Sequence, residues 1–590
     1  MKNLRKLTSL LLAVMLVVSM ATVSVVSTSA VVEDGGSEYR YEIYDGTAKI
    51  TGYTGEDTNL VIPSEIDGYM VTSIGGSAFR NCNSLESVTL PSTLTKIEQR
   101  AFSYCENLKN ITLSSNLTRM DREVFSYCRN LKSITLPNSL TKISDSVFLG
   151  CISLERVILP NNLVSIGPDA FSNCWNLKNI TIPDSVTSIG TRAFTKCTNL
   201  QSVTLSSNLT NMGVETFSYC SSLKSINIPD GVTSIGSSTF SRCTILESVT
   251  IPDSITKIGS DAFAYCECIE SITIPDSVTK IGSGAFIYCT GLKSINIPNY
   301  VTSVGGAAFA YCESIESIRI PNSVTSIGKY AFSWCTRLES ITLPSNLTSI
   351  EEGTFEGCES LKGIAIPNYL TSIGNFAFKY CRNIENITLP DNVTSISEGV
   401  FSGCSNLQSI TIPNGVTSIG DWAFEDCLNI KSITIPDSVT TIGIWTFGEC
   451  FNLESVTIPD SVTSIGDWAF DGCISLESIT IPDSVTSLGK HSFGYNYNNK
   501  IDGFTIYGYE GTAAEEYANE NGFEFVALGK EIIGDVNSDG KLSVADATII
   551  QKYLADLIEL TAEQLSLADV NGDGFVNVSD ATAIQSLLVS

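Results

Sequence analysis

Two acidic segments near the C-terminus carry the residues best suited to chemistry. Residues 535–546 read DVNSDGKLSVAD and residues 569–580 read DVNGDGFVNVSD, a duplication with an offset of 34 residues. In both segments, oxygen-bearing side chains stand at positions 1, 3, 5, 9 and 12, and glycine stands at position 6. Calcium prefers such oxygen ligands, and the glycine allows the sharp turn that wraps a loop around the ion. The pattern therefore predicts calcium binding.

The predicted ligands follow the order of an EF-hand-type loop. In the first loop they are Asp535, Asn537, Asp539, Ser543 and Asp546, with the backbone carbonyl of Lys541. In the second loop they are Asp569, Asn571, Asp573, Asn577 and Asp580, with the backbone carbonyl of Phe575. Carboxylates crowded in this way repel one another until a hard cation neutralises them. The duplication thus predicts two calcium ions.

The segment departs from the standard EF-hand in two ways. Position 12 is Asp rather than Glu, and Gly534 stands where a helix would lead into the first loop. A helix is predicted after each loop, over DATIIQKYLADL and DATAIQSLLVS. Together these features resemble a type I dockerin over about residues 532–590. The alternative is a calcium-stabilised domain without a partner.

The resemblance implies docking onto a cohesin domain of a cellulosome scaffoldin. It places the cohesin contacts at loop positions 10 and 11 and on the following helix: Val544, Ala545, Gln551 and Lys552 in one half, and Val578, Ser579, Gln585 and Ser586 in the other. Lys552 and Ser586 occupy equivalent positions but differ in charge, so the two halves are not expected to bind equally. Because a segment of about 60 residues has a small core, calcium is expected to support its folding.

Most of the remaining chain is a repeat of 23 residues. Cysteine recurs at this step from Cys82 to Cys473, with only Cys268 out of register, and phenylalanine recurs from Phe79 to Phe493. In AFxxCxxL the apolar residues lie three or four apart, as on one face of a short helical turn. In SITIP the isoleucines alternate with Ser and Thr, as in a half-buried strand. Nineteen such units, each unable to bury its apolar face alone, predict a parallel solenoid.

The repeat LxSIxIPxxVTSIGxxAFxxC resembles the BspA-like class of bacterial leucine-rich repeats. The resemblance implies a β-rich leucine-rich-repeat solenoid with a short strand and a helical turn in each repeat, followed by a small α-helical calcium-loop dockerin domain. The expected organisation is a signal peptide (1–30), an N-terminal cap (31–62), the repeats (63–500), a C-terminal cap (501–530) and the dockerin (532–590). The repeat itself carries no reaction, so its ligand is open.

The repeated cysteines allow two interpretations. In a stack in register their Cβ vectors point the same way, which favours buried free thiols over disulfides, although cysteines of an exported chain often pair. Aromatic residues form two further columns, one with Trp422, Trp445 and Trp468, and one with Tyr265, Tyr288, Tyr311 and Trp334. They are either residues that cover the coil edge or a platform that binds polysaccharide or a surface protein.

Composition and the N-terminus narrow the classes of function. A net charge of −28 without a basic cluster argues against nucleic-acid binding. Lys2, Arg5 and Lys6 precede an apolar run from Leu10 to Val18, which is typical of a secretory signal and too short to span a membrane. We therefore expect a secreted, extracellular protein, associated with a cell surface or a cellulosome. The repeats and caps leave no room for a catalytic domain, so we predict a noncatalytic binding protein whose solenoid binds polysaccharide or a cell surface. The alternative is a protein-interaction or inhibitory subunit of the same assembly.

Overall fold

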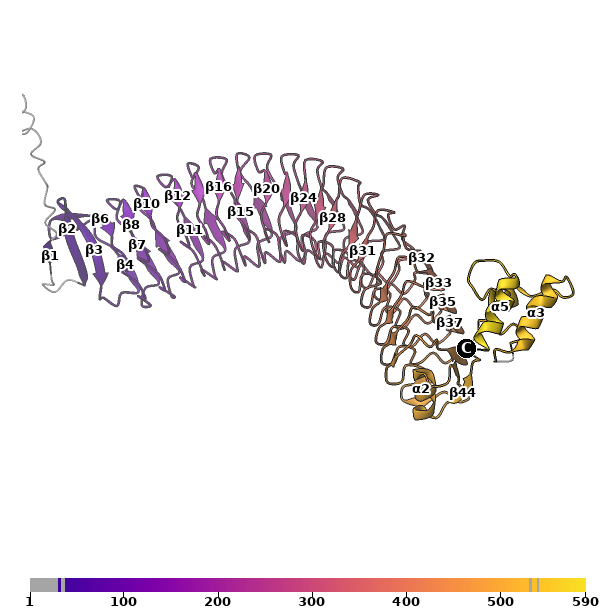
Figure 1. Ribbon diagram of the computed structural model, residues 1–590. Coiled ribbons are helices and arrows are strands. Elements are labelled where there is room, and N and C mark those ends of the chain that lie inside the picture. The colour runs from indigo at the N-terminus through magenta and orange to yellow at the C-terminus, as the bar shows by residue number, and fades with distance from the viewer. Residues whose placement is uncertain (1–29, 33–37, 530–532, 539–540, 590) are drawn as a thin grey trace, which may run out of the picture. The chain divides into compact units, whose positions relative to one another are not determined.

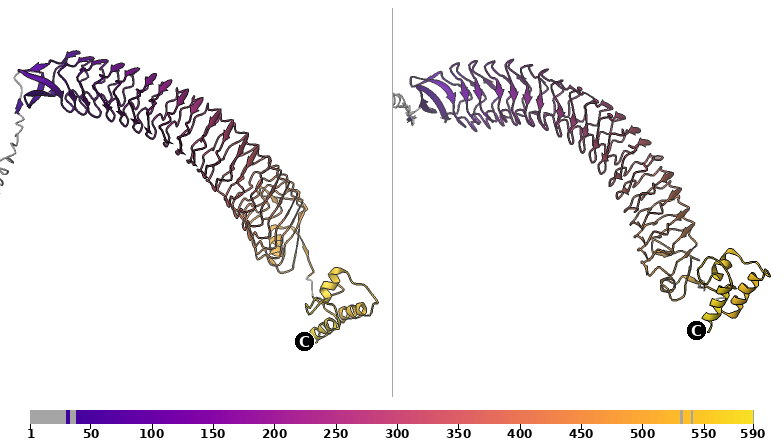
Figure 2. Two further views of the ribbon diagram at one scale, coloured as in Figure 1. Left: turned by 90° about the horizontal axis from the view of Figure 1, so that it is seen from above. Right: turned by 45° about the horizontal axis from the view of Figure 1, so that its top comes forward.

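The computed structural model describes residues 30–32, 38–529, 533–538 and 541–589. The chain divides into two compact units, residues 1–313 and 314–590. In each unit, successive coils lie side by side with their short strands aligned (Figures 1 and 2). The predicted signal segment falls within residues 1–30, of which only Ala30 belongs to the described part of the chain.

Most coils contribute two strands, and the sequence pattern alternates in both. In β23 (Ser271–Thr273) the middle residue Ile272 is buried between two exposed residues. In β24 (Lys280–Ile281) the lysine is exposed and the isoleucine is buried. The first strand is the one predicted from SITIP, and the second comes from the VTKIG or VTSIG segment.

The strands pair in parallel with a register of 23 residues. Ser165 of β14 (Ser165–Ile166) lies opposite Ser188 of β16 (Ser188–Ile189), and Ser432 of β35 (Ser432–Thr434) lies opposite Ser455 of β37 (Ser455–Thr457). A shift of one residue would turn every buried isoleucine toward solvent, so burial fixes this register.

In the first unit, residues before the regular coils form β1 (Ala30–Val32), β2 (Tyr39–Tyr44), β3 (Thr47–Tyr53), β4 (Asn59–Val61), β5 (Glu65–Ile66) and β6 (Tyr69–Ile74). The first strands of its coils are β7 (Ser87–Thr89), β9 (Asn110–Thr112), β11 (Ser133–Thr135), β13 (Arg156–Ile158), β15 (Asn179–Thr181), β17 (Ser202–Thr204), β19 (Ser225–Asn227), β21 (Ser248–Thr250), β23 and β25 (Ser294–Asn296). The second strands are β8 (Lys96–Ile97), β10 (Arg119–Met120), β12 (Lys142–Ile143), β14, β16, β18 (Asn211–Met212), β20 (Ser234–Ile235), β22 (Lys257–Ile258), β24 and β26 (Ser303–Val304).

In the second unit the first strands are β27 (Ser317–Arg319), β29 (Ser340–Thr342), β32 (Asn386–Thr388), β33 (Ser409–Thr411), β35, β37 and β39 (Ser478–Thr480). The second strands are β28 (Ser326–Ile327), β30 (Ser349–Ile350), β31 (Ser372–Ile373), β34 (Ser418–Ile419), β36 (Thr441–Ile442), β38 (Ser464–Ile465) and β40 (Ser487–Leu488). They are followed by β41 (Tyr495–Asn496), β42 (Asn499–Lys500), β43 (Thr505–Gly508), α2 (Ala513–Asn521), β44 (Glu524–Ala527), α3 (Val544–Leu554), α4 (Ala562–Ala568) and α5 (Val578–Leu587).

The predicted helical turn takes the form of overlapping hydrogen-bonded turns. Cys105 N donates to Phe102 O of its own coil (3.2 Å), whereas Phe102 N donates to Val124 O of the next coil (3.0 Å). Arg100 and Tyr104 have left-handed backbones, with φ of 59° and 61°, and the same two positions are left-handed throughout the repeats. A left-handed residue interrupts a right-handed helix, so each coil turns sharply and then bonds to its neighbour.

A column of stacked phenylalanines fills the core of each unit. From Phe79 to Phe309 in the first unit, neighbouring ring centroids lie 4.9–5.9 Å apart with nearly parallel planes. In the second unit, neighbouring rings from Phe332 to Phe493 lie 4.8–5.9 Å apart. These rings are almost wholly buried, so they supply much of the apolar surface that stacking removes from water.

Aromatic residues cover the first phenylalanine of the first unit and the last phenylalanine of the second unit. The Tyr53 ring, from the β2–β3 hairpin, packs on Phe79 with a centroid distance of 5.3 Å. In the second unit, Tyr517 of α2 meets Phe493 edge to face, and its hydroxyl donates to Phe493 O (2.9 Å). Solenoids need such ends because their terminal coils have an open apolar face.

The C-terminal helices enclose a much smaller core. Its fully buried residues are Val536, Ala547, Ile550, Ala568, Ala581 and Ile584, contributed mainly by α3 and α5. Such a core gives little apolar stabilisation, so this region depends on further interactions to stay folded.

Candidate functional sites

The two predicted calcium loops lead directly into α3 and α5. Ser543 and Asn577 are the N-cap residues, and Asp546 and Asp580 complete a capping box in each helix. Asp546 Oδ2 accepts from Ser543 N (2.9 Å), and Asp580 Oδ2 accepts from Asn577 N (2.8 Å). The last predicted ligand of each loop is therefore also the residue that fixes the start of the helix.

The same two carboxylates hold the loop backbones. Asp546 Oδ1 accepts from Asn537 N (3.1 Å), and Asp580 Oδ1 accepts from Asn571 N (3.2 Å). Both aspartates are fully buried, and no Lys, Arg or His of the described chain forms an ion pair with either of them. A buried carboxylate without a counter-ion is unfavourable, so the arrangement fits a bound cation.

The second loop is described in full. Asp569 accepts from Asp573 N (3.1 Å) and Gly574 N (2.8 Å), so the chain wraps around this carboxylate. Asp573 accepts in turn from Phe575 N (2.9 Å). Gly574, at position 6, has φ of 83°, the left-handed conformation for which the sequence pattern requires glycine.

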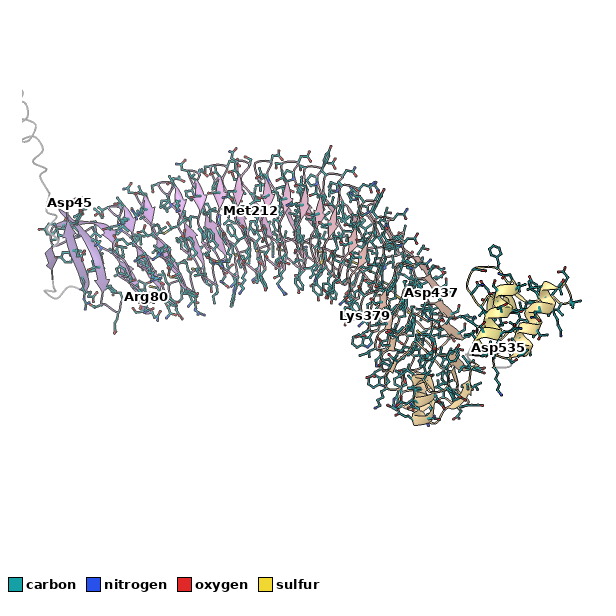
Figure 3. The ribbon with its side chains drawn as sticks, in the orientation of Figure 1. Asp45, Arg80, Met212, Lys379, Asp437 and Asp535 are labelled. Atoms are coloured by element: carbon teal, nitrogen blue, oxygen red, sulfur yellow. The ribbon has the colours of Figure 1, made fainter. Side chains whose placement is uncertain are left out.

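The first loop has the same geometry where it is described. Position 4 is left-handed in both loops, at Ser538 (φ 55°) and Gly572 (φ 70°). Asp535, labelled in Figure 3, is buried at the start of the loop. The predicted ligand Asp539 lies outside the described residues.

The donor set of these loops suits calcium. Among the described residues, no three Asp, Glu, His or Cys side chains meet closely enough to form a metal site by themselves. The loops instead mix carboxylates with amide, hydroxyl and backbone oxygens, which is the combination calcium accepts. Softer ions, which prefer sulfur or imidazole, find neither in these loops.

The residues predicted to contact cohesin lie on the outside of the helix pair. All eight are exposed, and Val544 and Val578 keep 64% and 70% of their surface accessible. The two valines occupy the first turns of α3 and α5, in equivalent positions next to the two loops. The two halves thus present an exposed valine at equivalent positions.

Comparison with known protein families agrees with both parts of the chain. The BspA type leucine rich repeat region matches residues 54–174, 141–270, 256–385 and 371–500. The chain belongs to the BspA-type leucine-rich repeat family. The type I dockerin domain matches residues 533–588, so this BspA-type protein ends in a dockerin, a module that docks onto cohesin. Both matched families are noncatalytic.

Several solved leucine-rich repeat structures are similar to this BspA-type protein. One from Bacteroides ovatus is 26% identical, covering 81% of this chain and 100% of its own, with a TM-score of 0.38. A leucine rich cell surface protein from Faecalibacterium prausnitzii is 30% identical, covering 65% of this chain and 94% of its own, with a TM-score of 0.34. No curated protein matches the chain. In the part of the chain that the structure describes, no helix is long and apolar enough to cross a membrane.

The tyrosine column of this BspA-type protein is stacked face to face. Tyr265, Tyr288 and Tyr311 lie in successive coils with centroid distances of 4.6 and 4.3 Å, and the Arg242 guanidinium covers Tyr265 at 4.0 Å. Trp334 lies flat over the next coil, where a Cβ on Gly357 would come within 2.6 Å of the indole. The rings therefore cover one another's faces and turn their edges outward.

The tryptophan column is only partly brought together. Trp445 and Trp468 stack with a centroid distance of 6.1 Å, whereas Trp422 has no ring partner among the described residues. All three are half-buried. The structure thus brings together two of the three tryptophans, and their rings stack less closely than those of the tyrosine column.

The repeated cysteines are free thiols, as their register indicated. Cys289 Sγ donates to Phe263 O of the preceding coil (3.2 Å), and the same bond recurs along both units at 3.0–3.3 Å. Burial raises the pKa of Cys289 to about 12. Such thiols are poor nucleophiles, which assigns the column to packing.

An acidic pair that sequence reasoning missed lies in the second unit. Asp426 and Glu449 stand at the same position of adjacent coils and share a hydrogen bond. Tyr497 donates to Glu449, and its backbone N donates to Asp471 Oδ2 (3.1 Å). Aligning the repeats would have found the pair, because the position before cysteine is acidic in both coils.

We expect this pair to make the stability of the solenoid depend on pH. Burial, followed by the hydrogen bond and charge of Glu449, raises the pKa of Asp426 to about 6. Because this exceeds the value near 3.9 in the unfolded chain, the pair stabilises the fold below about pH 4 and loses that effect as the pH rises through about 6. Asp426→Asn should therefore flatten the decrease of the calorimetric midpoint between pH 4 and 7. Identical profiles for this variant and for wild type would contradict the assignment, and the exposed Asp437→Asn serves as control.

Proposed function

We propose that the protein is a secreted, noncatalytic binding subunit that a type I cohesin anchors to a cellulosome-like scaffold. The observation that carries this proposal is the duplicated geometry of the dockerin. In each half, a buried aspartate joins a calcium loop to a helix whose first turn exposes a valine. This supports a surface that forms when calcium binds and then meets cohesin.

Two calcium ions would be held by the ligands predicted from the two loops. Calcium would supply the positive charge that Asp546 and Asp580 lack, and it would thereby hold the N-cap of each helix in place. Val544, Ala545, Gln551 and Lys552, or Val578, Ser579, Gln585 and Ser586, would then contact cohesin. Because Lys552 has Ser586 as its counterpart, we expect one half to bind more tightly than the other.

The noncatalytic role has support from the repeats. The only histidine, His491, packs its ring on Tyr495 with a centroid distance of 3.9 Å. The buried thiols donate to backbone carbonyls and have raised pKa values. Neither therefore has the pairing of nucleophile and base that covalent catalysis requires.

The solenoid would carry the second binding function. Its ligand would be a polysaccharide or a cell surface, and the alternative is a protein partner within the same assembly. A sugar stacks on the face of an aromatic ring, whereas the tyrosine rings here cover one another's faces. This geometry supports the protein alternative for the tyrosine column and leaves the tryptophans as the better polysaccharide candidates.

One retention experiment tests both functions. The full chain, held on cohesin-coated beads in calcium, should retain added plant polysaccharide. Substituting Trp422, Trp445 and Trp468 with Ala should keep cohesin binding and lower polysaccharide retention at least fivefold, because half-buried indoles supply most of the apolar contact there. Unchanged retention with a folded triple variant would favour the protein partner, and failure to bind cohesin would contradict the docking.

A further inference from the structure

The first-strand column of the second unit is interrupted at residues 363–366. β29 pairs with β27, and β32 pairs with β33, and other first strands of this unit likewise pair with one neighbour. The coil between them forms no first strand, and its residues 363–366 make no hydrogen bond in the described chain. Four consecutive residues, all at least partly exposed, therefore present backbone N–H and C=O groups that have no partner within the described chain.

The local sequence explains the interruption. Regular coils read Ser-Ile-Thr-Ile before the proline, as at residues 432–435, whereas this coil reads Gly-Ile-Ala-Ile. Glycine and alanine are poor strand formers because they offer little side chain to pack on a pleated surface. Ile364 and Ile366 are consequently only half-buried, whereas Ile387 and Leu389 of the next coil are 4% and 5% exposed.

A cleft of about 700 Å³ opens at this interruption. On one side the coils stay joined by Asn383 N, which donates to Glu359 O (3.1 Å), and on the other by Asn392 Nδ2, which donates to Asn368 O (3.0 Å). Between these two bonds the coils part. The lining combines apolar Ile364, Ile366 and Leu389 with polar Asn386, Thr388 and Asp391.

We infer that this cleft binds an extended polypeptide segment through backbone hydrogen bonds. A strand of four residues spans about 13 Å and presents N–H and C=O groups at the spacing of the unpaired groups of residues 363–366. Its alternate side chains would meet the half-buried Ile364 and Ile366. The donor and acceptor rows of a peptide edge fit this backbone, whereas sugar hydroxyls have no such fixed alternation.

The charge of the cleft indicates which kind of polypeptide segment it would bind. Asp391 is the one charged residue among those that line the cleft, and the whole chain carries a net charge of −28. An uncharged or basic segment with β-branched residues therefore fits best. This inference rests on the proposed binding role of the solenoid and names its partner as a polypeptide, while docking to cohesin is independent of it.

A repaired coil tests the inference. Gly363→Ser with Ala365→Thr restores the regular strand sequence, so residues 363–365 should form a strand that pairs with a neighbouring coil, and the cleft should narrow. The probe is a fluorescein-labelled peptide of sequence NIKSITIP, the chain's own residues 429–436, with its C-terminus amidated. Fluorescence anisotropy on the full chain should show binding to wild type and at least tenfold weaker binding to the repaired variant.

Three controls decide the result. The same peptide, methylated on two alternate backbone nitrogens, should also bind at least tenfold more weakly, since it keeps its side chains but loses donors. Thr411→Ala, on the paired strand β33, should bind like wild type. Equal binding by the repaired variant or by the methylated peptide would overturn the inference, as would displacement of the peptide by a soluble β-glucan. Cohesin binding, measured on the same samples, should stay unchanged in every variant.

Discussion

Removal of calcium with EDTA is expected to unfold the dockerin and abolish binding to cohesin, while the solenoid remains folded. Among the described residues, the dockerin core contains only six fully buried apolar residues. The carboxylates of Asp546 and Asp580 are buried without a paired cation, and each of them fixes the start of a helix. A ligand present at 1,000 times its dissociation constant stabilises the bound state by about 4 kcal/mol, which is a large part of the stability of so small a domain.

Calorimetry and cohesin titration would measure this effect. With calcium, the full chain should show a separate dockerin transition that disappears in EDTA, whereas the larger transition of the repeats stays in place. Asp546→Ala and Asp580→Ala should each lower the calcium stoichiometry from two to one. Each substitution should unfold only the first turn of the helix that the aspartate caps, α3 for Asp546 and α5 for Asp580. Cohesin binding that persists in excess EDTA would contradict the coupling.

The physical reason for this coupling could be predicted only in part. The positions of the loops and of the following helices follow from the spacing of Asp, Asn and Gly, whereas the calcium ligands stay a prediction. That Asp546 and Asp580 also accept hydrogen bonds from the N-cap residues is the new element in the structure. Its sequence signal was present, because Ser543 and Asp546, or Asn577 and Asp580, stand three apart as in a capping box.

The features of the solenoid that could be predicted are those for which the sequence pattern fits only one structure. The alternation in SITIP gave the first strand, and the 23-residue step set the register. The second strand was missed, because VTSIG alternates over only two residues and glycine follows at once. The spacing of apolar residues in AFxxC fits a helical turn, but it fits a series of hydrogen-bonded turns equally well. The structure has the turns, which differ from a helix by the left-handed residues two positions before phenylalanine and one position before cysteine. A left-handed Arg or Tyr has no clear sequence signal.

The candidate sites of the solenoid could not be predicted from one repeat alone, because they depend on which residues neighbouring coils have at the same position. Whether an aromatic side chain presents its face or its edge to solvent depends on the residues at the same position of the neighbouring coils. The ring of Tyr288, for example, is covered on both faces by Tyr265 and Tyr311. The cleft at residues 363–366 depends on Gly363 and Ala365, two small residues at positions where regular coils have serine and threonine. Both become visible when each position is compared with its neighbours 23 residues away.

Phe286→Ala should destabilise the repeats by about 3–5 kcal/mol, the range for removing a buried aromatic side chain from a core. Its ring is fully buried between Phe263 and Phe309, at centroid distances of 5.3 and 5.4 Å. In a stack where each coil contacts only its neighbours, the cavity weakens two interfaces at once. Urea denaturation followed by tryptophan fluorescence and circular dichroism would measure the change.

Tyr288→Gly, two residues away in the same coil, provides the matched comparison. The substitution removes two ring contacts worth about 0.5–1.5 kcal/mol each, but it also relieves a left-handed backbone, with φ of 58°, that a non-glycine residue adopts at about 1–2 kcal/mol. These effects nearly cancel, and glycine already occupies this position at Gly150, Gly357, Gly403 and Gly472. We therefore expect a change below about 1 kcal/mol. If Tyr288→Gly destabilised the repeats as much as Phe286→Ala, the half-buried column, rather than the phenylalanine core, would be holding the coils together.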